Sequence, residues 1–424
     1  MLRVVYGPFQ PDLEQAFLAH LRELQKSGQG PVVIVAPSRR LADRLQRLAV
    51  VDGNLALFDF QFHTFYSLAE TLIAQEGRPK GRLISDPAFH DRVVDALLED
   101  HPESAALFGG AAARPRALAA ALRASLRDLI AAGVRQEEVA EHFGSDLLAD
   151  AHEGRRLNSL LKLAAAYEKR LEDLGLISPS GLTRLATQAC EQSRWLAGLR
   201  SVVYYGFYDL TGLQLDFFEA VVAQSKATLF FPYRRGHPAF RFADALFEQK
   251  LLRHEAVAAA SPGTSRAVGP ALEGLFLGGA HGEVAPGALE FISASGTRDE
   301  VWAAAKEILS LVESGFCRFD EIGVVARTLE PYRSALAEVF EENAIPFDLA
   351  VGEPLLRRPL AKFALNLLAL RRRDFPAAVV ADLLGSPYFA RRPPPRVLRH
   401  WRLAVERLGI HAGWLQWRKL ESFD

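Results

Sequence analysis

Val32-Val33-Ile34-Val35-Ala36 is the stretch that decides the fold, because a continuous run of mostly β-branched apolar residues is typical of a strand buried on both faces. A strand is also expected at Arg3–Tyr6, and helical spacing of apolar residues predicts a helix at Leu13–Leu21 between the two strands. A second helix is expected at Arg39–Leu48 and a third strand at Leu57–Phe60. Strands and helices that alternate at this spacing indicate parallel βαβ units, so we predict an α/β fold.

The alternating pattern is interrupted from about Asp86 to Gln192, where strand signals vanish and Ala, Leu, Arg and Glu dominate. This composition predicts an all-helical block of about a hundred residues. Strands are expected again at Ser201–Tyr205 and Ala227–Phe231. We therefore interpret the helical block as an insertion within the first α/β domain.

A second α/β unit is expected after a stretch rich in Ala, Gly, Ser and Pro at residues 259–287, which we interpret as a linker or loop. Strands are predicted at Leu289–Ala294 and Ile322–Ala326, and helices at Arg298–Ser314 and Tyr332–Asn343. The predicted domains are residues 1–85 and 196–285 for the first α/β domain, 86–195 for its helical insertion, 286–373 for the start of the second α/β domain and 374–424 for the start of a second, truncated helical insertion.

The composition fits a globular protein of about three domains, with 424 residues, 49% apolar and 24% charged. The sequence has no uninterrupted apolar run of about 18 residues that would span a membrane, and its first residues do not resemble a signal peptide. Its two cysteines, Cys190 and Cys317, are far apart in sequence and are interpreted as structural thiols. We expect a cytoplasmic protein without a metal site.

The net charge of −1 is the sum of two unlike parts. Residues 351–424 contain 14 Lys and Arg against 6 Asp and Glu, a net charge of +8, and the preceding residues carry −9. Trp401, Trp414 and Trp417 are interleaved with these basic residues, a pattern that suits single-stranded nucleic acid. A helical hairpin that lacks its packing partner would have the same features, and both interpretations stay open.

The turn after the first strand is where a nucleotide phosphate loop, G-x-x-x-x-G-K-[ST], would stand. Its first glycine is present as Gly7, but Asp12, Leu13 and Glu14 replace the second glycine, the lysine and the hydroxyl residue. Two prolines remove amide donors, and the acidic side chains would repel a triphosphate at the helix N-terminus. We expect no triphosphate binding at this turn.

No catalytic constellation is recognisable elsewhere. An ATPase of this class needs an acidic pair at the end of a later strand, and Tyr205 and Gly206 occupy those positions. The eleven histidines show no H-E-x-x-H spacing, and there is no G-x-S-x-G motif. The sequence therefore predicts no catalytic residue in this chain.

Four segments together resemble AddB-type subunits of AddAB helicase–nucleases, which are related to the UvrD/Rep and RecBCD helicases. They are the strand–turn–helix at 3–21, Pro37-Ser38-Arg39 with Phe60–Phe65, Tyr205–Gln214 (similar to D-G-F-x-x-F-T-x-x-Q), and the stretch from Asp299 to Phe347. The resemblance implies two RecA-like, P-loop NTPase-like domains with an inserted all-helical domain. It also implies that the chain is an N-terminal fragment, and that an iron–sulfur cluster, Mg²⁺ and a PD-(D/E)XK exonuclease site lie beyond residue 424.

The resemblance also suggests site residues. Arg327 matches the position of an arginine that contacts the γ-phosphate in active relatives, and here we interpret it as vestigial. His63, Thr64 and Phe62 end a strand at the edge where parallel sheets bind ligands, and are candidates for DNA contacts. The alternatives, a structural histidine with its hydrogen bonds satisfied and an aromatic side chain of the core, stay open. Arg234 and Arg235 follow another strand at the same edge and are candidates for phosphate contacts, with a solvated loop as the alternative.

The function that the sequence favours is a helicase-like, non-hydrolysing DNA-binding scaffold. It would belong to a helicase–nuclease that processes double-strand breaks for recombination repair, and would grip single-stranded DNA while an AddA-type motor subunit moves it. An active ATP-dependent helicase domain is the first alternative, and a protein-interaction module that binds no DNA is the second.

Overall fold

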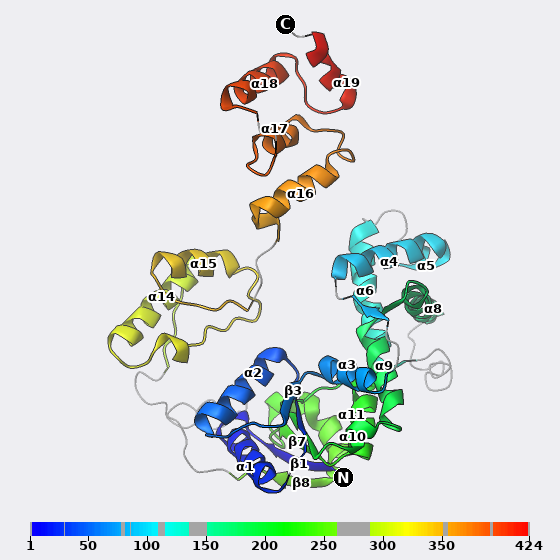
Figure 1. The fold of residues 1–424 in the computed structure, drawn as a ribbon, viewed down its shortest axis with the longest axis vertical. Coiled ribbons are helices and arrows are strands. Elements are labelled where there is room, and N and C mark those ends of the chain that lie inside the picture. The colour runs from blue at the N-terminus through cyan, green and yellow to red at the C-terminus, as the bar shows by residue number, and fades with distance from the viewer. Residues whose placement is uncertain are drawn as a thin grey trace. The chain divides into compact units, whose positions relative to one another are not determined.

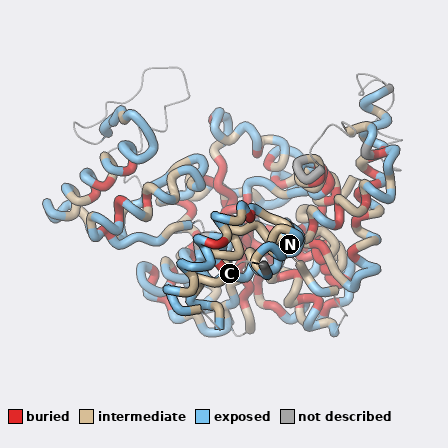
Figure 2. The backbone as a smooth tube through the Cα atoms, turned by 90° about the horizontal axis from the view of Figure 1, so that it is seen from above, coloured by how far each residue is buried: buried red, intermediate tan, exposed pale blue. Residues whose placement is uncertain are grey.

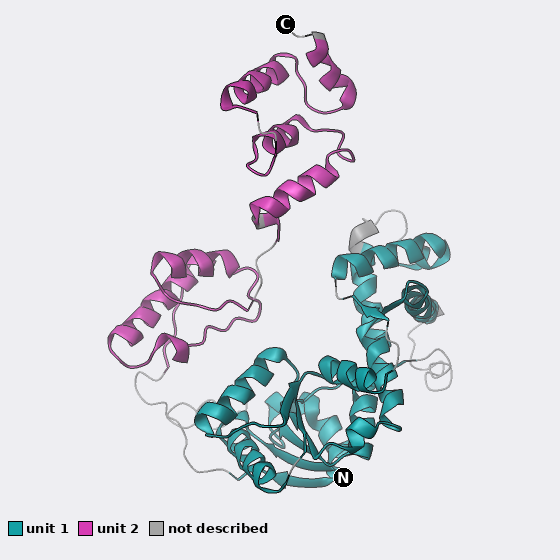
Figure 3. Cartoon of the chain, in the orientation of Figure 1, with its two compact units in different colours: residues 1–288 teal, residues 289–424 magenta. Residues whose placement is uncertain are grey.

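The computed structural model of the chain describes residues 2–28, 30–77, 81–84, 86–108, 115–134, 151–260, 289–350, 355–390 and 393–422. These residues form two compact units, 1–288 and 289–424, which Figure 3 distinguishes by colour. Each unit is described by itself.

The first unit is built on a six-stranded sheet with the order β3-β2-β6-β7-β1-β8, in which all neighbouring strands are parallel. The prediction of an α/β fold is confirmed. Its strands are β1 (Leu2–Gly7), β2 (Val32–Val35), β3 (Phe60–His63), β6 (Ser201–Tyr205), β7 (Ala227–Pro232) and β8 (Glu255–Ala258).

Helices cover both faces of this sheet (Figure 1). One face packs against α1 (Glu14–Lys26) and α2 (Arg39–Arg47), and the other against α3 (Phe65–Gln75), α9 (Pro179–Cys190), α11 (Gly212–Gln224) and α12 (Asp244–Gln249), with the short α10 (Arg194–Ala197) nearby. All four residues of β2 and all five of β6 are buried, as their continuous apolar sequences predict.

The third strand lies three residues later than predicted, at β3 instead of Leu57–Phe60. Asp59, just before β3, has a positive φ of 61°, so the chain turns there and cannot continue an extended strand. Pairing with β2 then begins at Phe60, opposite Val32. The sequence pattern identified the strand, but the turn sets its first residue.

Helices also fill the described part of the segment between β4 (Arg82–Leu83) and β5 (Leu176–Ile177). They are α4 (Pro87–Asp100), α5 (Pro102–Leu107), α6 (Pro115–Ala132) and α8 (Ala151–Asp173), and α4, α6 and α8 share a core of their own. In this core the His90 ring lies 2.7 Å from the Tyr167 hydroxyl through Nδ1 and 2.8 Å from the Ile84 carbonyl through Nε2, so both ring nitrogens are satisfied. That these helices form an independent inserted domain stays a prediction.

The segment enters and leaves the α/β part of the unit at one place. β4 and β5 pair in parallel, with Arg82 opposite Leu176. Gly81 lies so close to this partner that a Cβ atom there would be 2.8 Å from the Leu176 carbonyl carbon. The chain segments that lead into and out of the helices are therefore held together by backbone contact.

The second unit begins with α14 (Thr297–Glu313) and α15 (Arg333–Glu342), whose apolar faces pack around Val301, Val339 and Phe340. The strands predicted at Leu289–Ala294 and Ile322–Ala326 are wrong: both segments lack regular secondary structure. Phe291 is 90% exposed and Val325 93% exposed, and within residues 289–350 no strand pairs with either segment. Without a neighbouring strand, an apolar run cannot form the backbone hydrogen bonds of a sheet. A second RecA-like domain stays a prediction.

The remaining helices of the second unit are α16 (Pro359–Ala369), α17 (Ala377–Gly385), α18 (Pro395–Arg407) and α19 (Trp414–Trp417). Buried side chains are sparse in this region, and Figure 2 shows the tube near the C-terminus mostly in the colours of intermediate and exposed residues. The stretch that we interpreted as a linker, 259–287, lies outside the described residues except for its first two.

Candidate functional site

The carboxyl ends of the parallel strands meet at one edge of the first sheet, and the loops after them carry most of the sequence-predicted site residues. β7 separates β1 from β6, so the phosphate-loop turn and the position of the missing acids lie two strands apart at this edge. Ligands of open parallel sheets bind outside such an edge. We call it the carboxyl edge.

The turn that corresponds to a phosphate loop, Phe9–Leu13 after β1, uses its own polar groups. The Leu13 amide donates to the Pro8 carbonyl at 3.1 Å, and the Glu14 amide donates to the Pro11 carbonyl. The prolines themselves have no amide hydrogen. Four of the positions that would cradle phosphates therefore offer no free donor.

The side chains of the turn also differ from those that a bound triphosphate needs. Leu13, at the lysine position, is fully buried in the core between the sheet and α1. Asp12 is only 7% exposed, and the Glu14 carboxylate forms an ion pair with Arg44 of α2 at 2.5 Å. The arrangement places a carboxylate and an apolar side chain where a triphosphate needs cations and amides.

An aromatic cluster joins the turn to β6. The Phe9 ring lies 5.8 Å from the Tyr205 ring, and Tyr205 also contacts Phe17 at 5.1 Å and Phe230 at 5.9 Å. Tyr205 occupies the position expected for a metal-binding acid, and its side chain is fully buried in this cluster. Burial, with a smaller contribution from the Glu14 carboxylate, raises the pKa of the Tyr205 hydroxyl, so this group stays neutral.

His63 and Thr64 lie at the end of β3. Thr64 begins α3: its hydroxyl accepts a hydrogen bond from the Ser67 amide at 3.2 Å, and its amide donates to the Ser67 hydroxyl at 2.8 Å. The His63 Nδ1 atom lies 3.3 Å from the same hydroxyl. Burial, and to a lesser degree the Arg39 guanidinium, lowers the pKa of His63 against the opposing effect of Ser67. The imidazole is therefore neutral at physiological pH, and Phe62 packs partly buried against the α1–α2 side of the core.

Arg234 and Arg235 follow β7. Arg235 is exposed and lies 3.8 Å from the Glu248 carboxylate, which is also exposed, and Arg234 is half-buried. Arg327 belongs to the second unit, where it is exposed. Exposed pairs of this kind contribute little to stability and can exchange partners.

Two exposed aromatic residues at the carboxyl edge were missed by the sequence reasoning. Tyr208, after β6, is 45% exposed, and Phe242, in the helical turn Pro238–Ala243 after β7, is 61% exposed. Their rings lie 5.4 Å apart and nearly perpendicular. The available signal was the pair Phe207-Tyr208 at a strand end, where adjacent aromatic side chains cannot both face the core.

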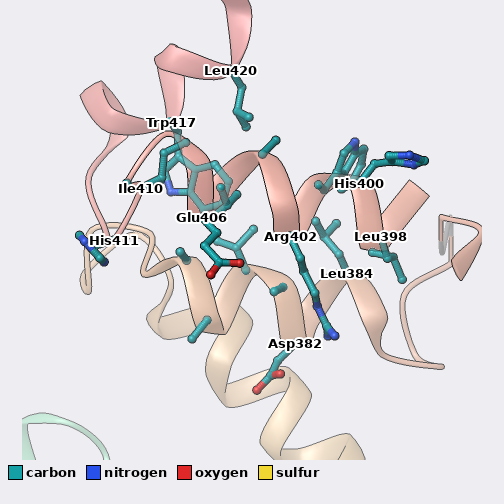
Figure 4. Close-up of a pocket in the computed structure, with 18 residues that line it drawn as sticks. Asp382, Leu384, Leu398, His400, Arg402, Glu406, Ile410, His411, Trp417 and Leu420 are labelled. Atoms are coloured by element: carbon teal, nitrogen blue, oxygen red, sulfur yellow. The ribbon is translucent and has the colours of Figure 1, made fainter. Parts of the chain in front are cut away.

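The second unit has a separate cavity of about 900 Å³, between α17, α18 and the turn after α19. Figure 4 shows Trp417 and Glu406 together on one side of it and His400 on the other. The Trp417 Nε1–H group donates to the Phe375 carbonyl at 2.8 Å, and most of the lining is apolar. Its lining also includes the charged residues Asp382, Arg402 and Glu406.

The chain does not fit an iron–sulfur cluster, since its two cysteines cannot supply four thiolate ligands. Cys190 is fully buried, and burial raises the pKa of its thiol to about 12. In the part of the chain that the structure describes, no group of three or more His, Cys, Asp or Glu side chains could hold a metal ion. Nor does any described helix have both the length and the apolarity to cross a membrane.

Comparisons with known proteins give consistent results. No family model matches the chain. The chain is similar to curated proteins named as the B subunit of ATP-dependent helicase/deoxyribonuclease from Heliobacterium modesticaldum (25% identity, covering 88% of this chain and 33% of that protein) and Lysinibacillus sphaericus (22%, 89% and 33%). A protein of the same name from Latilactobacillus sakei is 24% identical over 69% of this chain and 27% of its own length.

The chain spans about a third of the length of these relatives. Their identity to it is modest, but it extends over most of the chain, through both units. The resemblance to AddB-type subunits that the sequence motifs indicated is confirmed: the curated relatives of this chain are the B subunits of ATP-dependent helicase/deoxyribonucleases.

Proposed function

We propose that this chain is a helicase-like, non-hydrolysing DNA-binding part of a helicase–nuclease that processes DNA double-strand breaks for recombination repair. In this proposal the first sheet is a RecA-like domain, and the chain acts in the cytoplasm beside an AddA-type motor subunit. The names of its relatives support the helicase–nuclease assignment. The geometry of the carboxyl edge supports two finer statements: first, that the chain does not hydrolyse ATP, and second, that it binds DNA.

The turn after β1, whose amides form hydrogen bonds within the turn itself, supports the proposal that ATP is not hydrolysed. Phosphate-loop enzymes depend on free backbone amides, a lysine and a metal-binding hydroxyl. Here the amides of Leu13 and Glu14 are bonded within the turn, Leu13 replaces the lysine, and Glu14 pairs with Arg44. Tyr205 stands in place of the acidic residue that would bind Mg²⁺ and position water.

The proposal of DNA binding is supported by three arginines in two loops of the carboxyl edge: Arg39 at the start of α2, and Arg235 and Arg241 after β7. All three are exposed, and the partners known for two of them are exposed carboxylates, Asp43 at 3.0 Å and Glu248 at 3.8 Å. A DNA phosphate can replace such a carboxylate, because an exposed ion pair is worth little in water. His63 is neutral at this edge, so it would contribute a hydrogen bond and no charge.

Nucleotide titration and ATPase assays of the full chain test the first statement. We expect neither ATPγS binding in the millimolar range nor hydrolysis of Mg-ATP, with or without single-stranded DNA. The variant Glu14→Ala/Arg44→Ala is the matched control: it removes the ion pair but leaves Leu13 and the internal amide bonds, so it should not bind nucleotide either. DNA-stimulated hydrolysis by the wild-type chain would instead support an active helicase.

Binding of labelled single-stranded DNA at increasing salt tests the second statement. The logarithm of the affinity should fall linearly with the logarithm of the salt concentration, because phosphate contacts release counterions. Arg235→Gln and Arg241→Gln should each reduce the slope by about one. An affinity that does not change with salt would contradict phosphate recognition. Capture of a helicase partner without any DNA affinity would favour an interaction module.

A further inference from the structure

Tyr208 and Phe242 contact each other, yet both side chains remain exposed to solvent. The two residues leave 45% and 61% of their surface in water, although their rings touch each other at 5.4 Å with an angle of 75°. An edge-to-face pair covers only one face of one ring, so aromatic surface stays open to a ligand. Large exposed apolar side chains that gather at one place commonly mark a binding site.

The loop after β6 holds Tyr208 in this outward position. Gly206 has a positive φ of 82°, and a Cβ atom there would lie 2.8 Å from the Leu41 Cδ2 atom, so the turn requires glycine. After this turn Phe207 faces the core, where its ring packs 4.9 Å from that of Phe65. The next residue, Tyr208, is consequently directed away from the core.

Phe242 is held in a similar way by the turn after β7. Phe240 packs at 6.2 Å against Tyr233, and Ala243 is fully buried, while Arg241 and Phe242 between them are both exposed. The Tyr233 hydroxyl donates to the Asp244 carboxylate at 2.6 Å, and the His237 ring accepts from the Ala239 amide at 3.2 Å. Both aromatic side chains are thus presented on anchored loops, which limits the entropy that binding would cost.

We propose that Tyr208 and Phe242 form a stacking platform for the bases of single-stranded nucleic acid; this inference rests on the proposed DNA-binding function of the carboxyl edge. The exposed Arg241 precedes Phe242, and Arg235 lies in the same loop, so cations that can contact phosphates flank the rings. Base faces are free in a single strand but covered by their neighbours in a duplex. The platform therefore selects single strands, and it tolerates every base because each has an aromatic face.

Fluorescence anisotropy with the full chain tests this platform. The probes are an oligothymidylate of about 16 nucleotides, a size that an aromatic-lined groove can hold, a duplex of equal length, and a strand of equal length with abasic sites. The variants are Phe242→Leu, which keeps an apolar side chain but loses the ring, Phe242→Tyr, which keeps the ring, and Tyr208→Leu. The matched control is Phe58→Leu. Phe58 is 83% exposed and precedes β3, so it lies at the amino ends of the strands, away from the carboxyl edge.

We expect Phe242→Leu and Tyr208→Leu each to weaken oligothymidylate binding about tenfold, in the range measured for loss of one stacked base. Binding of the abasic strand should change less than about twofold, and Phe242→Tyr and Phe58→Leu should bind like the wild type. Equal losses on the normal and abasic strands, or no loss in either leucine variant, would overturn the platform while leaving the DNA-binding proposal intact. No binding by the wild-type chain would overturn both.

Discussion

The sheet of residues 2–260 and the segment 289–350 contain apolar runs of the same kind, but only the first forms strands. Val203 in β6 is fully buried between β2 and β7, whereas Val325 is 93% exposed. Both lie in runs for which a strand was predicted. The comparison teaches that such a run identifies a segment able to form a strand, and that the neighbouring strands decide whether it does.

The helices of the two regions differ less. The helix predicted at Arg298–Ser314 is observed as α14 and that at Tyr332–Asn343 as α15, each within one residue, just as Arg39–Leu48 is observed as α2. Helices satisfy their backbone within one segment, so local pattern and capping suffice. A strand needs a partner that can be far away in sequence.

The largest expected effect compares two valines. Val203→Asp places a carboxylate where no side chain can pair with it, and should lower the free energy of unfolding by more than about 4 kcal/mol. Val325→Asp exchanges an exposed side chain and should change it by less than about 0.5 kcal/mol. Denaturant titration of the two variants measures both values. A comparable loss in Val325→Asp would show that 322–326 is buried in solution.

A smaller effect is expected at two glycines: Gly206 in the turn after β6, and Gly323 in a segment where a strand was predicted but is not observed. Gly206→Ala should cost about 1–3 kcal/mol, because it places a Cβ atom at positive φ, 2.8 Å from the Leu41 side chain. Gly323→Ala should be close to neutral, since no atom lies within 4 Å of its added Cβ. Thermal unfolding of both variants gives the comparison, and a neutral Gly206→Ala would contradict the turn that directs Tyr208 outward.

The smallest effect concerns His63. Its pKa is lowered from 6.5, mainly by burial, so near that pH the unfolded chain binds more protons than the folded one. The free energy of unfolding should therefore fall as the pH drops through about 6.5, with no contribution from His63 above that range. His63→Gln should reduce this slope, measured by denaturant titration between about pH 7.5 and 5.5, with exposed His400→Gln as the control variant. An unchanged slope would show that His63 is not desolvated.

Part of the candidate site was visible in the sequence. Asp12, Leu13 and Glu14 differ from the phosphate-loop pattern in residue type alone, and Thr64 followed by Ser67 has the spacing of a helix cap. That the Leu13 amide bonds to Pro8 depends on the path of the backbone, which residue types do not specify. The contact of Tyr208 with Phe242 joins two loops and needs the strand order, which local patterns do not provide.

The pairing of β4 with β5 brings the two ends of the helical segment together. Because the helical segment leaves and rejoins the α/β part through adjacent backbones, it interrupts no strand of the six-stranded sheet and changes none of its pairings. The short pairing of Arg82–Leu83 with Leu176–Ile177 is therefore a single junction, and the register of the six-stranded sheet does not depend on the length of the helices beyond it.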